Sequence, residues 1–542
     1  MIDKNNLTAF LYKNYYYIFL AIFLIWMGIG CFPLYCYESD SMHTILGYYT
    51  VYTHGFDLPP LYSYEYDMQP LLYVVIPWLK FILPFFNVEQ IFCLLTAIAA
   101  MINIILCIEL VYKLTKINRL LILFATFLLP ESVAIGMYPN TAVFAILFVV
   151  IGLHLLLEKR FMLSTLFLII APTFRIDVVM IYPVVMFILW WMGYSFWKSL
   201  KVTVIMALVI VTGLVVAYYL LQANPLTTTL SGYESWNNQI SLRHNLVAVY
   251  TYYTICNLIL VPMGIYLLVK NKNIKLLCVM LVPIVLNHIV YARMGCATKH
   301  FAYMMPFTIA LSTFAIQFLK NWLKARVIYK YAVIILLVLY LCVSIRFTVP
   351  TRPWYSRTQQ VPCVINIFNE EKTKYQISMG IGGGMFLKTF DELMLASGNL
   401  FYPVYINQYK AERLAKREHL YEYMKDKANV TYLGLSWEVQ ANTAIAYINN
   451  GYSLSTNEKL FSLEKENNKV SIILDQFIIE GNAETRHNLW NQAINNIKKG
   501  NQNLYCFTIE DTSIYFLNQL VEEGTVKSLM ENLYFIETGH NK

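Results

Sequence analysis

Charged residues are scarce in this 542-residue sequence: Asp, Glu, Lys and Arg together make up 14% of it, whereas 58% is hydrophobic. The mean hydropathy is +0.50. A soluble protein cannot bury that much apolar surface, so the composition excludes a wholly soluble chain and indicates a membrane protein. The formal charge of +8 is concentrated in short loops and does not indicate a nucleic-acid partner.

Several common motifs are also missing. No small-residue cleavage site follows the first apolar run, 15–36, which is too long for the core of a signal peptide. Most of the ten cysteines lie inside apolar runs, and Cys31 and Cys36 do not form a metal-binding pattern. The glycine run 382–384 lacks the Lys-Ser/Thr of a P-loop, so we expect a turn there.

The apolar residues that are present come in long runs between about residues 15 and 345. We predict about eleven membrane spans, because each run can cross much of the ~30 Å hydrocarbon layer. They lie at about 15–36, 90–112, 120–138, 141–157, 161–174, 178–194, 202–222, 246–269, 276–292, 301–319 and 331–348. The sequence thus predicts a transmembrane domain over 1–349.

Residues 350–542 have the composition of a soluble domain. Amphipathic helical stretches, 408–428 and 484–499, lie among short β-like runs, and this alternation predicts a small α/β domain. The β-like runs are Gln376–Gly382, Val430–Leu435, Lys469–Ile479, Leu504–Glu510 and Leu533–Glu537. The expected fold class is therefore an all-α polytopic membrane protein with a C-terminal extracytoplasmic α/β domain.

The distribution of lysine and arginine predicts the topology. One set of loops carries fourteen of them: Lys113, Lys116, Arg119, Lys159, Arg160, Lys198, Lys201, Lys270, Lys272, Lys275, Lys320, Lys324, Arg326 and Lys330. The opposite set carries four: Arg175, Arg243, Arg293 and Lys299. The positive-inside rule places the larger set and the N-terminus in the cytoplasm, provided that the run 71–86 lies at the interface without crossing. The stretch 37–89 is then an external loop, and the C-terminal domain is external.

Four groups of polar residues at span ends are candidates for chemistry, because polar groups there cost solvation energy. They are Glu38-Ser39-Asp40 with His43, Tyr66–Tyr73 with Gln69, Pro172–Asp177 with Arg175, and Arg293 with Lys299–Tyr303 and Pro306. The predicted topology places all four outside.

The first group contains a possible base. A carboxylate that is partly desolvated at a membrane boundary has a raised pKa and can accept a proton. An acid that is merely solvated at the interface explains Glu38 and Asp40 equally well. Gln69 opens the interfacial helix, where substrate contact and an ordinary helix start are equally good interpretations.

The basic groups also have two interpretations. Arg175 beside Asp177 favours a structural ion pair over a ligand contact. Arg293, Lys299 and His300 suit a lipid phosphate, which needs cationic donors at headgroup depth, while simple anchoring to headgroups is the alternative.

In this order, the four groups resemble those of GT-C class glycosyltransferases, which use polyprenyl-phosphate sugars. The closest branch holds the aminoarabinose transferases of lipid A and the protein O-mannosyltransferases, and the resemblance covers about residues 10–350. Asp40 falls on the catalytic acid of this branch. The other matching elements are Gly55-Phe56-Asp57, Met68–Tyr73, Thr173–Arg175 and Lys299–Pro306.

The sequence departs from the family pattern at three places. Ser41 replaces a second acid, and Met68 stands where a lysine is common. Asn140 stands where many members carry an aspartate that a divalent metal would need. We therefore expect neither a metal site nor a cofactor.

The resemblance implies an inverting transfer of sugar from a polyprenyl-phosphate donor to a hydroxyl of a lipid, glycan or protein acceptor. Asp40 is the expected general base. Arg175, Arg293, Lys299 and His300 are expected to stabilise the departing phosphate. Glu38, His43 and Gln69 complete the expected substrate contacts, and the expected location is the outer face of the inner membrane of a bacterium.

Two alternatives remain open at this point. A polymerase or ligase of a lipid-linked glycan pathway would need a large late external loop rich in Arg and His, whereas the loop 223–245 has only Arg243 and His244. A transporter of lipid-linked sugars would need mid-membrane charges and internal repeats, whereas the polar residues here lie at span ends.

Overall fold

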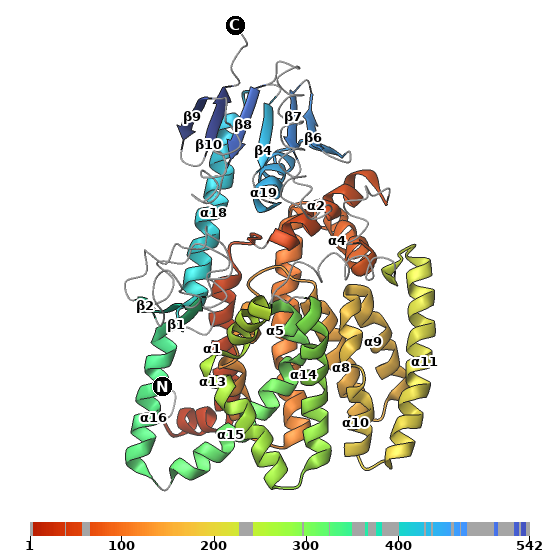
Figure 1. The fold of residues 1–542 in the computed structure, drawn as a ribbon, viewed down its shortest axis with the longest axis vertical. Coiled ribbons are helices and arrows are strands. Elements are labelled where there is room, and N and C mark those ends of the chain that lie inside the picture. The colour runs from red at the N-terminus through yellow and green to blue at the C-terminus, as the bar shows by residue number, and fades with distance from the viewer. Residues whose placement is uncertain are drawn as a thin grey trace. The chain divides into compact units, whose positions relative to one another are not determined.

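The apolar runs fold into helices in the computed structural model of the protein (Figure 1). An α-helix satisfies its own backbone N–H and C=O groups, which a segment inside hydrocarbon must do. The structure describes residues 4–37, 39–56, 66–226, 242–294, 298–324, 326–348, 364–366, 376–381, 400–427, 430–434, 437–456, 460–466, 468–473, 503–507, 525–530 and 533–537.

Contacts between Cα atoms divide the chain into two units. Unit 1 consists of Met1–Phe32, Met68–Leu71 and Leu94–Asn407. Unit 2 consists of Pro33–Asp67, Leu72–Cys93 and Gln408–Lys542. The boundary expected at 349/350 follows composition, and it stays a prediction.

Helices dominate unit 1. They are α1 (Lys4–Cys31), α5 (Val88–Thr115, from residue 94 on), α6 (Arg119–Phe127), α7 (Pro130–Ala134), α8 (Ala142–Leu157), α9 (Phe161–Phe174), η1 (Ile176–Ile181), α10 (Val184–Trp191), α11 (Phe196–Leu220), α13 (Leu242–Lys270), α14 (Ile274–Met294), η2 (Thr298–Met304), α15 (Met305–Lys324) and α16 (Val327–Cys342). Within the described residues, six helices are long and apolar enough to cross a membrane. Each of the eleven predicted runs coincides with a helix at least in part, and the number of spans stays a prediction.

Three of the predicted runs differ from the structure. The run 178–194 begins in the 3-10 helix η1, and α10 starts only at Val184. The run 120–138 is broken, because α6 ends at Phe127 and α7 begins at Pro130. Proline has no N–H to continue the helix. The run 331–348 is helical only to Cys342, and Val343–Thr348 forms strand β1. Polar residues alternate with apolar ones in this segment, which suits a strand better than a span.

A small sheet in unit 1 explains the strand at the end of α16. β1 pairs antiparallel with β3 (Gln376–Ile381), and β2 (Val364–Asn366) pairs antiparallel with the other edge of β3. The predicted strand at Gln376–Gly382 is thus confirmed. The glycine run 382–384 and the predicted helix 484–499 lie outside the described residues.

Unit 2 contains the α/β domain predicted from the C-terminal sequence. Its helices are α2 (Ser39–His54), α4 (Pro70–Ile82, from residue 72 on), the start of α5 (to residue 93), α18 (Tyr402–Met424, from residue 408 on) and α19 (Trp437–Ile448). Its strands are β4 (Val430–Gly434), β5 (Ser453–Thr456), β6 (Leu460–Lys465), β7 (Asn468–Ile473), β8 (Asn503–Phe507), β9 (Thr525–Met530) and β10 (Leu533–Glu537). The remaining predicted strands are confirmed where the structure describes them, and residues 474–479 and 508–510 of two of these strands lie outside the described part of the chain. The predicted helix 408–428 is confirmed as part of α18, which ends at Met424.

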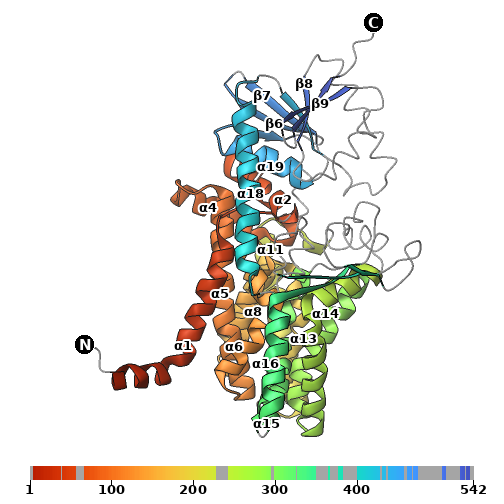
Figure 2. The same cartoon turned by 90° about the vertical axis from the view of Figure 1, so that its left-hand side faces the viewer.

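The seven strands form one mixed sheet in the order β5-β6-β7-β4-β8-β10-β9. β4 is parallel to both of its neighbours, with Val430 opposite Val470 of β7 and Asn503 of β8. α19 packs against β4, β6 and β7 (Figure 2). Ala444 and Ile445 of α19 and Val470 of β7 are fully buried, so this contact is part of the domain core.

α2 and α4 lie close together in unit 2. A Cβ atom at Gly47 of α2 would lie 2.5 Å from the hydroxyl oxygen of Tyr73 of α4, so glycine permits this approach. The 13 residues of α4 rise about 20 Å, which is less than the ~30 Å of hydrocarbon. This length suits the interfacial role predicted for the run 71–86.

Candidate active site

The third polar group of the sequence forms an ion pair. α9 ends at Phe174, and Arg175 has extended backbone before η1 begins. The Arg175 Nε donates to both carboxylate oxygens of Asp177 at 3.1 and 3.0 Å, and its Nη1 donates to Thr141 Oγ1 at 3.2 Å. The structural ion pair favoured by the sequence is therefore present.

Asp177 accepts from more donors than Arg175 alone. The hydroxyl of Tyr303 in η2 donates to Asp177 Oδ1 at 2.5 Å, and the hydroxyl of Tyr291 in α14 donates to Oδ2. One carboxylate thus joins η1, α14 and η2. Three donors to a single carboxylate offset the cost of holding its charge away from bulk water.

His300 lies beside this cluster. Its ring stacks on Tyr291, with the ring centroids 4.7 Å apart and the planes 8° from parallel. Its backbone carbonyl accepts a hydrogen bond of 3.0 Å from Asn287 Nδ2. Two groups that are 125 residues apart in the sequence therefore meet, because Tyr291 contacts both His300 and Asp177. We refer to Arg175, Asp177, Tyr291, His300 and Tyr303 as the Arg175 cluster.

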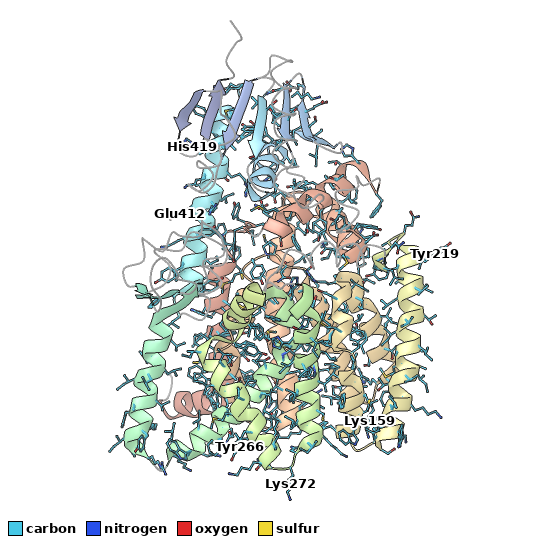
Figure 3. All side chains as sticks on the ribbon, viewed as in Figure 1. Lys159, Tyr219, Tyr266, Lys272, Glu412 and His419 are labelled. Carbon is cyan, nitrogen blue, oxygen red and sulfur yellow. The ribbon has the colours of Figure 1, made fainter. Side chains whose placement is uncertain are left out.

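The Arg175 cluster and the basic loops lie at opposite ends of the helices of unit 1. Figure 3 shows Lys159 and Lys272 at the lower end of these helices and Tyr219 at the upper end. α9 starts after Lys159 and runs about 21 Å to Arg175, and α14 starts after Lys272 and runs about 31 Å toward η2. The structure thus separates Arg175 from two lysines of the larger basic set.

The other predicted basic residues are on the same elements. Arg293 is the penultimate residue of α14, and Lys299 is the second residue of η2. Their side chains lie outside the described part of the chain. Gln69 directly precedes α4 and is buried, with 7% of its surface exposed.

Asp40 belongs to unit 2, where it is the second residue of α2. The first turn of a helix stabilises negative charge, because its free N–H groups and the helix dipole both favour an anion. His43 is in the next turn of α2. The side chains of Asp40 and His43, and the whole of Glu38, lie outside the described residues.

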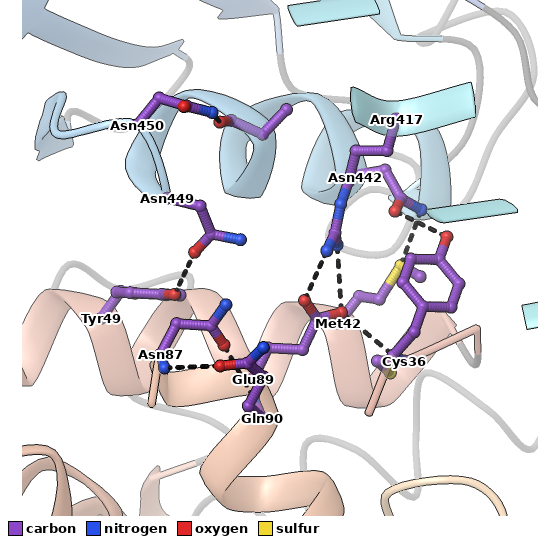
Figure 4. Close-up of polar contacts among 12 residues, drawn as sticks. Cys36, Met42, Tyr49, Asn87, Glu89, Gln90, Arg417, Asn442, Asn449 and Asn450 are labelled. Atoms are coloured by element: carbon purple, nitrogen blue, oxygen red, sulfur yellow. Dashed lines mark hydrogen bonds and ion pairs between the residues drawn. The ribbon is translucent and has the colours of Figure 1, made fainter. Parts of the chain in front are cut away.

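A second ion pair, in unit 2, was not predicted. Glu89 is in the first turn of α5, and Arg417 is on α18. Arg417 Nη1 and Nη2 donate to the two carboxylate oxygens at 3.0 and 2.7 Å (Figure 4). Glu89 Oε1 also accepts from the backbone N–H of Cys36 at 3.0 Å, just before α2.

This second pair is almost fully buried, since the side chains of Arg417 and Glu89 are 4% and 1% exposed. Burial by itself lowers the pKa of Arg417, but the charge and hydrogen bonds of Glu89 outweigh burial and raise it. Burial, and then the charge of Glu89, raises the pKa of the nearby Tyr49. Arg417 is therefore a permanent cation whose charge is balanced by Glu89.

Comparison with solved structures identifies the fold. No sequence-family profile matches the chain, and no curated protein matches its sequence. The crystal structure of apo ArnT from Cupriavidus metallidurans matches with a TM-score of 0.56 at 9% identity, covering 97% of this chain and 98% of that one. The structure of the same protein bound to undecaprenyl phosphate matches with a TM-score of 0.55 at 10% identity and the same coverage.

The chain has the same overall fold as ArnT. The likeness extends over nearly the whole chain, including the C-terminal domain, into which the sequence resemblance could not be followed. A polytopic helical membrane protein with a C-terminal α/β domain is thus confirmed as the fold class. Within the described residues, no group of three or more His, Cys, Asp or Glu is placed to hold a metal ion.

Proposed function

We propose that this protein is a membrane glycosyltransferase that moves a sugar from a polyprenyl-phosphate donor to an acceptor hydroxyl. The observation that carries the proposal is the full-length likeness to ArnT, one of whose structures is bound to undecaprenyl phosphate. The Arg175 cluster and the place of Asp40 at the start of a helix add support from the chain itself.

On the acceptor side, Asp40 acts as the general base. The acceptor oxygen attacks the anomeric carbon and loses its proton to Asp40 as the new glycosidic bond forms. Glu38 and His43, near Asp40 in the sequence, contact the acceptor or orient the base.

On the donor side, the bond from the anomeric carbon to the phosphate oxygen breaks, and its electron pair leaves with the polyprenyl phosphate. Attack from the opposite face inverts the anomeric centre. Arg175, Arg293, Lys299 and His300 stabilise the charge that develops on the phosphate. Gln69 contacts the sugar. Asp177 balances Arg175 before the donor binds, so that the site does not hold an uncompensated cation.

The proposed reaction takes place on the outer face of a bacterial inner membrane. The basic loops with Lys159 and Lys272 then face the cytoplasm, and the C-terminal domain is external. The orientation can be measured with a reporter fused after Lys542. Alkaline phosphatase activity is expected, whereas a fluorescent fusion that folds in the cytoplasm would refute this orientation.

The function is tested with purified protein and a panel of polyprenyl-phosphate sugars. Free polyprenyl phosphate should appear with at least one donor when acceptor lipids or glycans are present. Release of polyprenyl pyrophosphate with transfer of a whole glycan would instead identify a polymerase or ligase. Movement of the lipid-linked sugar across the membrane without any product would identify a transporter.

The donor site is tested separately by binding. Replacing Arg293 and Lys299 by methionine should weaken binding of polyprenyl-phosphate sugar, because the phosphate loses two cationic donors. Lys159→Met at the other end of the helices is the matched control and should bind the donor normally. Unchanged donor binding in the folded double variant would assign the two cations to headgroup anchoring.

A further inference from the structure

The start of α2 is tied to a helix of the C-terminal domain. The hydroxyl of Tyr35, four residues before α2, donates to Asn442 Oδ1 of α19 at 2.8 Å. Asn442 Nδ2 in turn lies 3.1 Å from the sulfur of Met42, in the first turns of α2. Asn442 is fully buried, so these contacts are shielded from water.

The rest of α2 is tied to the same domain. The Tyr49 hydroxyl donates to Asn449 Oδ1 at 2.7 Å (Figure 4). His54, the last residue of α2, contacts the backbone carbonyl of Leu454 in β5. α2 is therefore held near its start, at its middle and at its end by residues more than 390 positions later in the sequence.

The buried ion pair fixes the turn into α2. Glu89 binds the Cys36 N–H with the same oxygen that accepts from Arg417 Nη1. The planar guanidinium of Arg417 donates a hydrogen bond to each carboxylate oxygen of Glu89. The carboxylate can therefore neither shift nor rotate without breaking one of these hydrogen bonds. The guanidinium also stacks on Tyr35, 4.8 Å from the ring centroid. Arg417 thus contacts Tyr35 directly and Cys36 through Glu89.

We propose that Arg417 is a positioning residue that fixes α2, and with it Asp40, through Glu89. The C-terminal domain then contributes to catalysis, because α18 and α19 position the helix that carries the catalytic base. The inference rests on the proposed function in one respect, the role of Asp40. Arg417 does not touch the reacting atoms; it limits how far α2 can move, and a displacement of about 1 Å can cost about 100-fold in rate.

The test uses the full-length protein in lipid nanodiscs. Arg417→Gln removes the charge and one of the two paired hydrogen bonds. We expect kcat to fall by about 10- to 100-fold while KM for the polyprenyl-phosphate sugar stays unchanged. Hydrogen exchange of the backbone amides of 39–54 should become faster. Arg417→Lys keeps the charge but cannot donate two parallel hydrogen bonds to the Glu89 carboxylate. Its kcat and its exchange rate should lie between those of the wild type and Arg417→Gln.

Lys425→Gln is the matched control, because Lys425 is also a cation on the chain just after α18 but forms an exposed pair with Glu422. It should change neither kcat nor exchange. If Arg417→Gln does not fold, the variant Tyr35→Phe/Tyr49→Phe takes its place, since it removes two ties to α2 and keeps both rings. The same fall in kcat and faster exchange are expected.

Two results would overturn the proposal: an unchanged kcat in a folded Arg417→Gln protein, or a loss of kcat matched by an equal loss of donor binding, which signals general damage. Failure of the proposed function is a separate outcome. If the wild-type protein transfers no sugar, hydrogen exchange of the backbone amides of 39–54 is the deciding measurement. Faster exchange in Arg417→Gln than in the wild type supports the positioning of α2 by Arg417, and unchanged exchange refutes it.

Discussion

Arg175 with Asp177 in unit 1 and Arg417 with Glu89 in unit 2 are both arginine–carboxylate pairs, and they differ in their separation along the chain and in their burial. Arg175 and Asp177 are two residues apart, and their side chains are 19% and 18% exposed. Arg417 and Glu89 are 328 residues apart, and their side chains are 4% and 1% exposed. The first pair stabilises one turn between two helices, whereas the second joins distant segments of the chain.

The difference in burial determines what each pair costs to break. A charge that water can reach retains part of its solvation when its partner is lost. A fully buried charge does not, and removing its partner leaves most of the desolvation cost uncompensated. The pair in unit 2 should therefore matter more for stability, whereas the pair in unit 1 is better placed to exchange its partner for a ligand.

The largest expected effect concerns the helix that the second pair supports. Asp40→Asn is nearly isosteric but cannot accept a proton, so turnover at saturating donor should fall by about 10²–10⁴-fold. Unfolding and donor binding should stay as in the wild type. Glu38→Gln is the neighbouring control and should cost less. Near-normal turnover of Asp40→Asn would remove Asp40 as the base.

The next effect is on stability. Arg417→Met leaves the Glu89 carboxylate buried without its cation and should destabilise the protein by about 3–5 kcal/mol. Unfolding in mixed detergent micelles, followed by fluorescence, measures this change. The double variant Glu89→Met/Arg417→Met removes both charges and should recover much of the loss. A loss below about 1 kcal/mol, the range of surface pairs, would show that the pair is solvated in solution.

A smaller loss is expected in unit 1. Asp177→Asn keeps an acceptor for the tyrosine hydroxyls but leaves Arg175 without its counter-ion, so we expect about 1.5–3 kcal/mol of destabilisation. The same change frees Arg175 for phosphate, so binding of polyprenyl-phosphate sugar should be retained or strengthened. A loss as large as that of Arg417→Met would contradict the comparison of the two pairs.

The smallest loss of stability is expected for a solvent-exposed ion pair, which gives the reference for the two pairs above. Lys113 and Glu158 form a pair of 2.8 Å with side chains 33% and 45% exposed. Lys113→Met should therefore change stability by about 0–1 kcal/mol, which is the range of solvent-exposed pairs. The same unfolding measurement applies. A larger change would indicate that exposure does not rank these pairs.

Most of the fold was accessible from sequence patterns. Long apolar runs predicted helices that the structure contains, and alternating runs such as 430–435 predicted strands of the C-terminal sheet. The errors occurred where two tendencies compete. Pro130 interrupts an apolar run, and the segment 343–348 is apolar enough for a span but alternates like a strand. In the second case a pairing partner, β3, decided the outcome.

The candidate site was accessible in part. The pairing of Arg175 with Asp177 could be predicted from the sequence, because the two residues are only two positions apart between two apolar runs. Tyr291 and Thr141 could not be recognised, because nothing local distinguishes them from the other tyrosines and threonines at span ends. Their contacts arise because α8, α14 and η1 pack together.

The sequence by itself determined that this is a polytopic membrane protein, which residues carry charge near the ends of its apolar runs, and that the C-terminal part contains an α/β domain. These properties depend on composition and short-range periodicity, which the chain carries without folding. The tertiary structure alone decided that Glu89 meets Arg417 and that α2 is held by α18 and α19. Such contacts depend on how distant segments pack, and an exposed and a buried arginine look the same in a sequence.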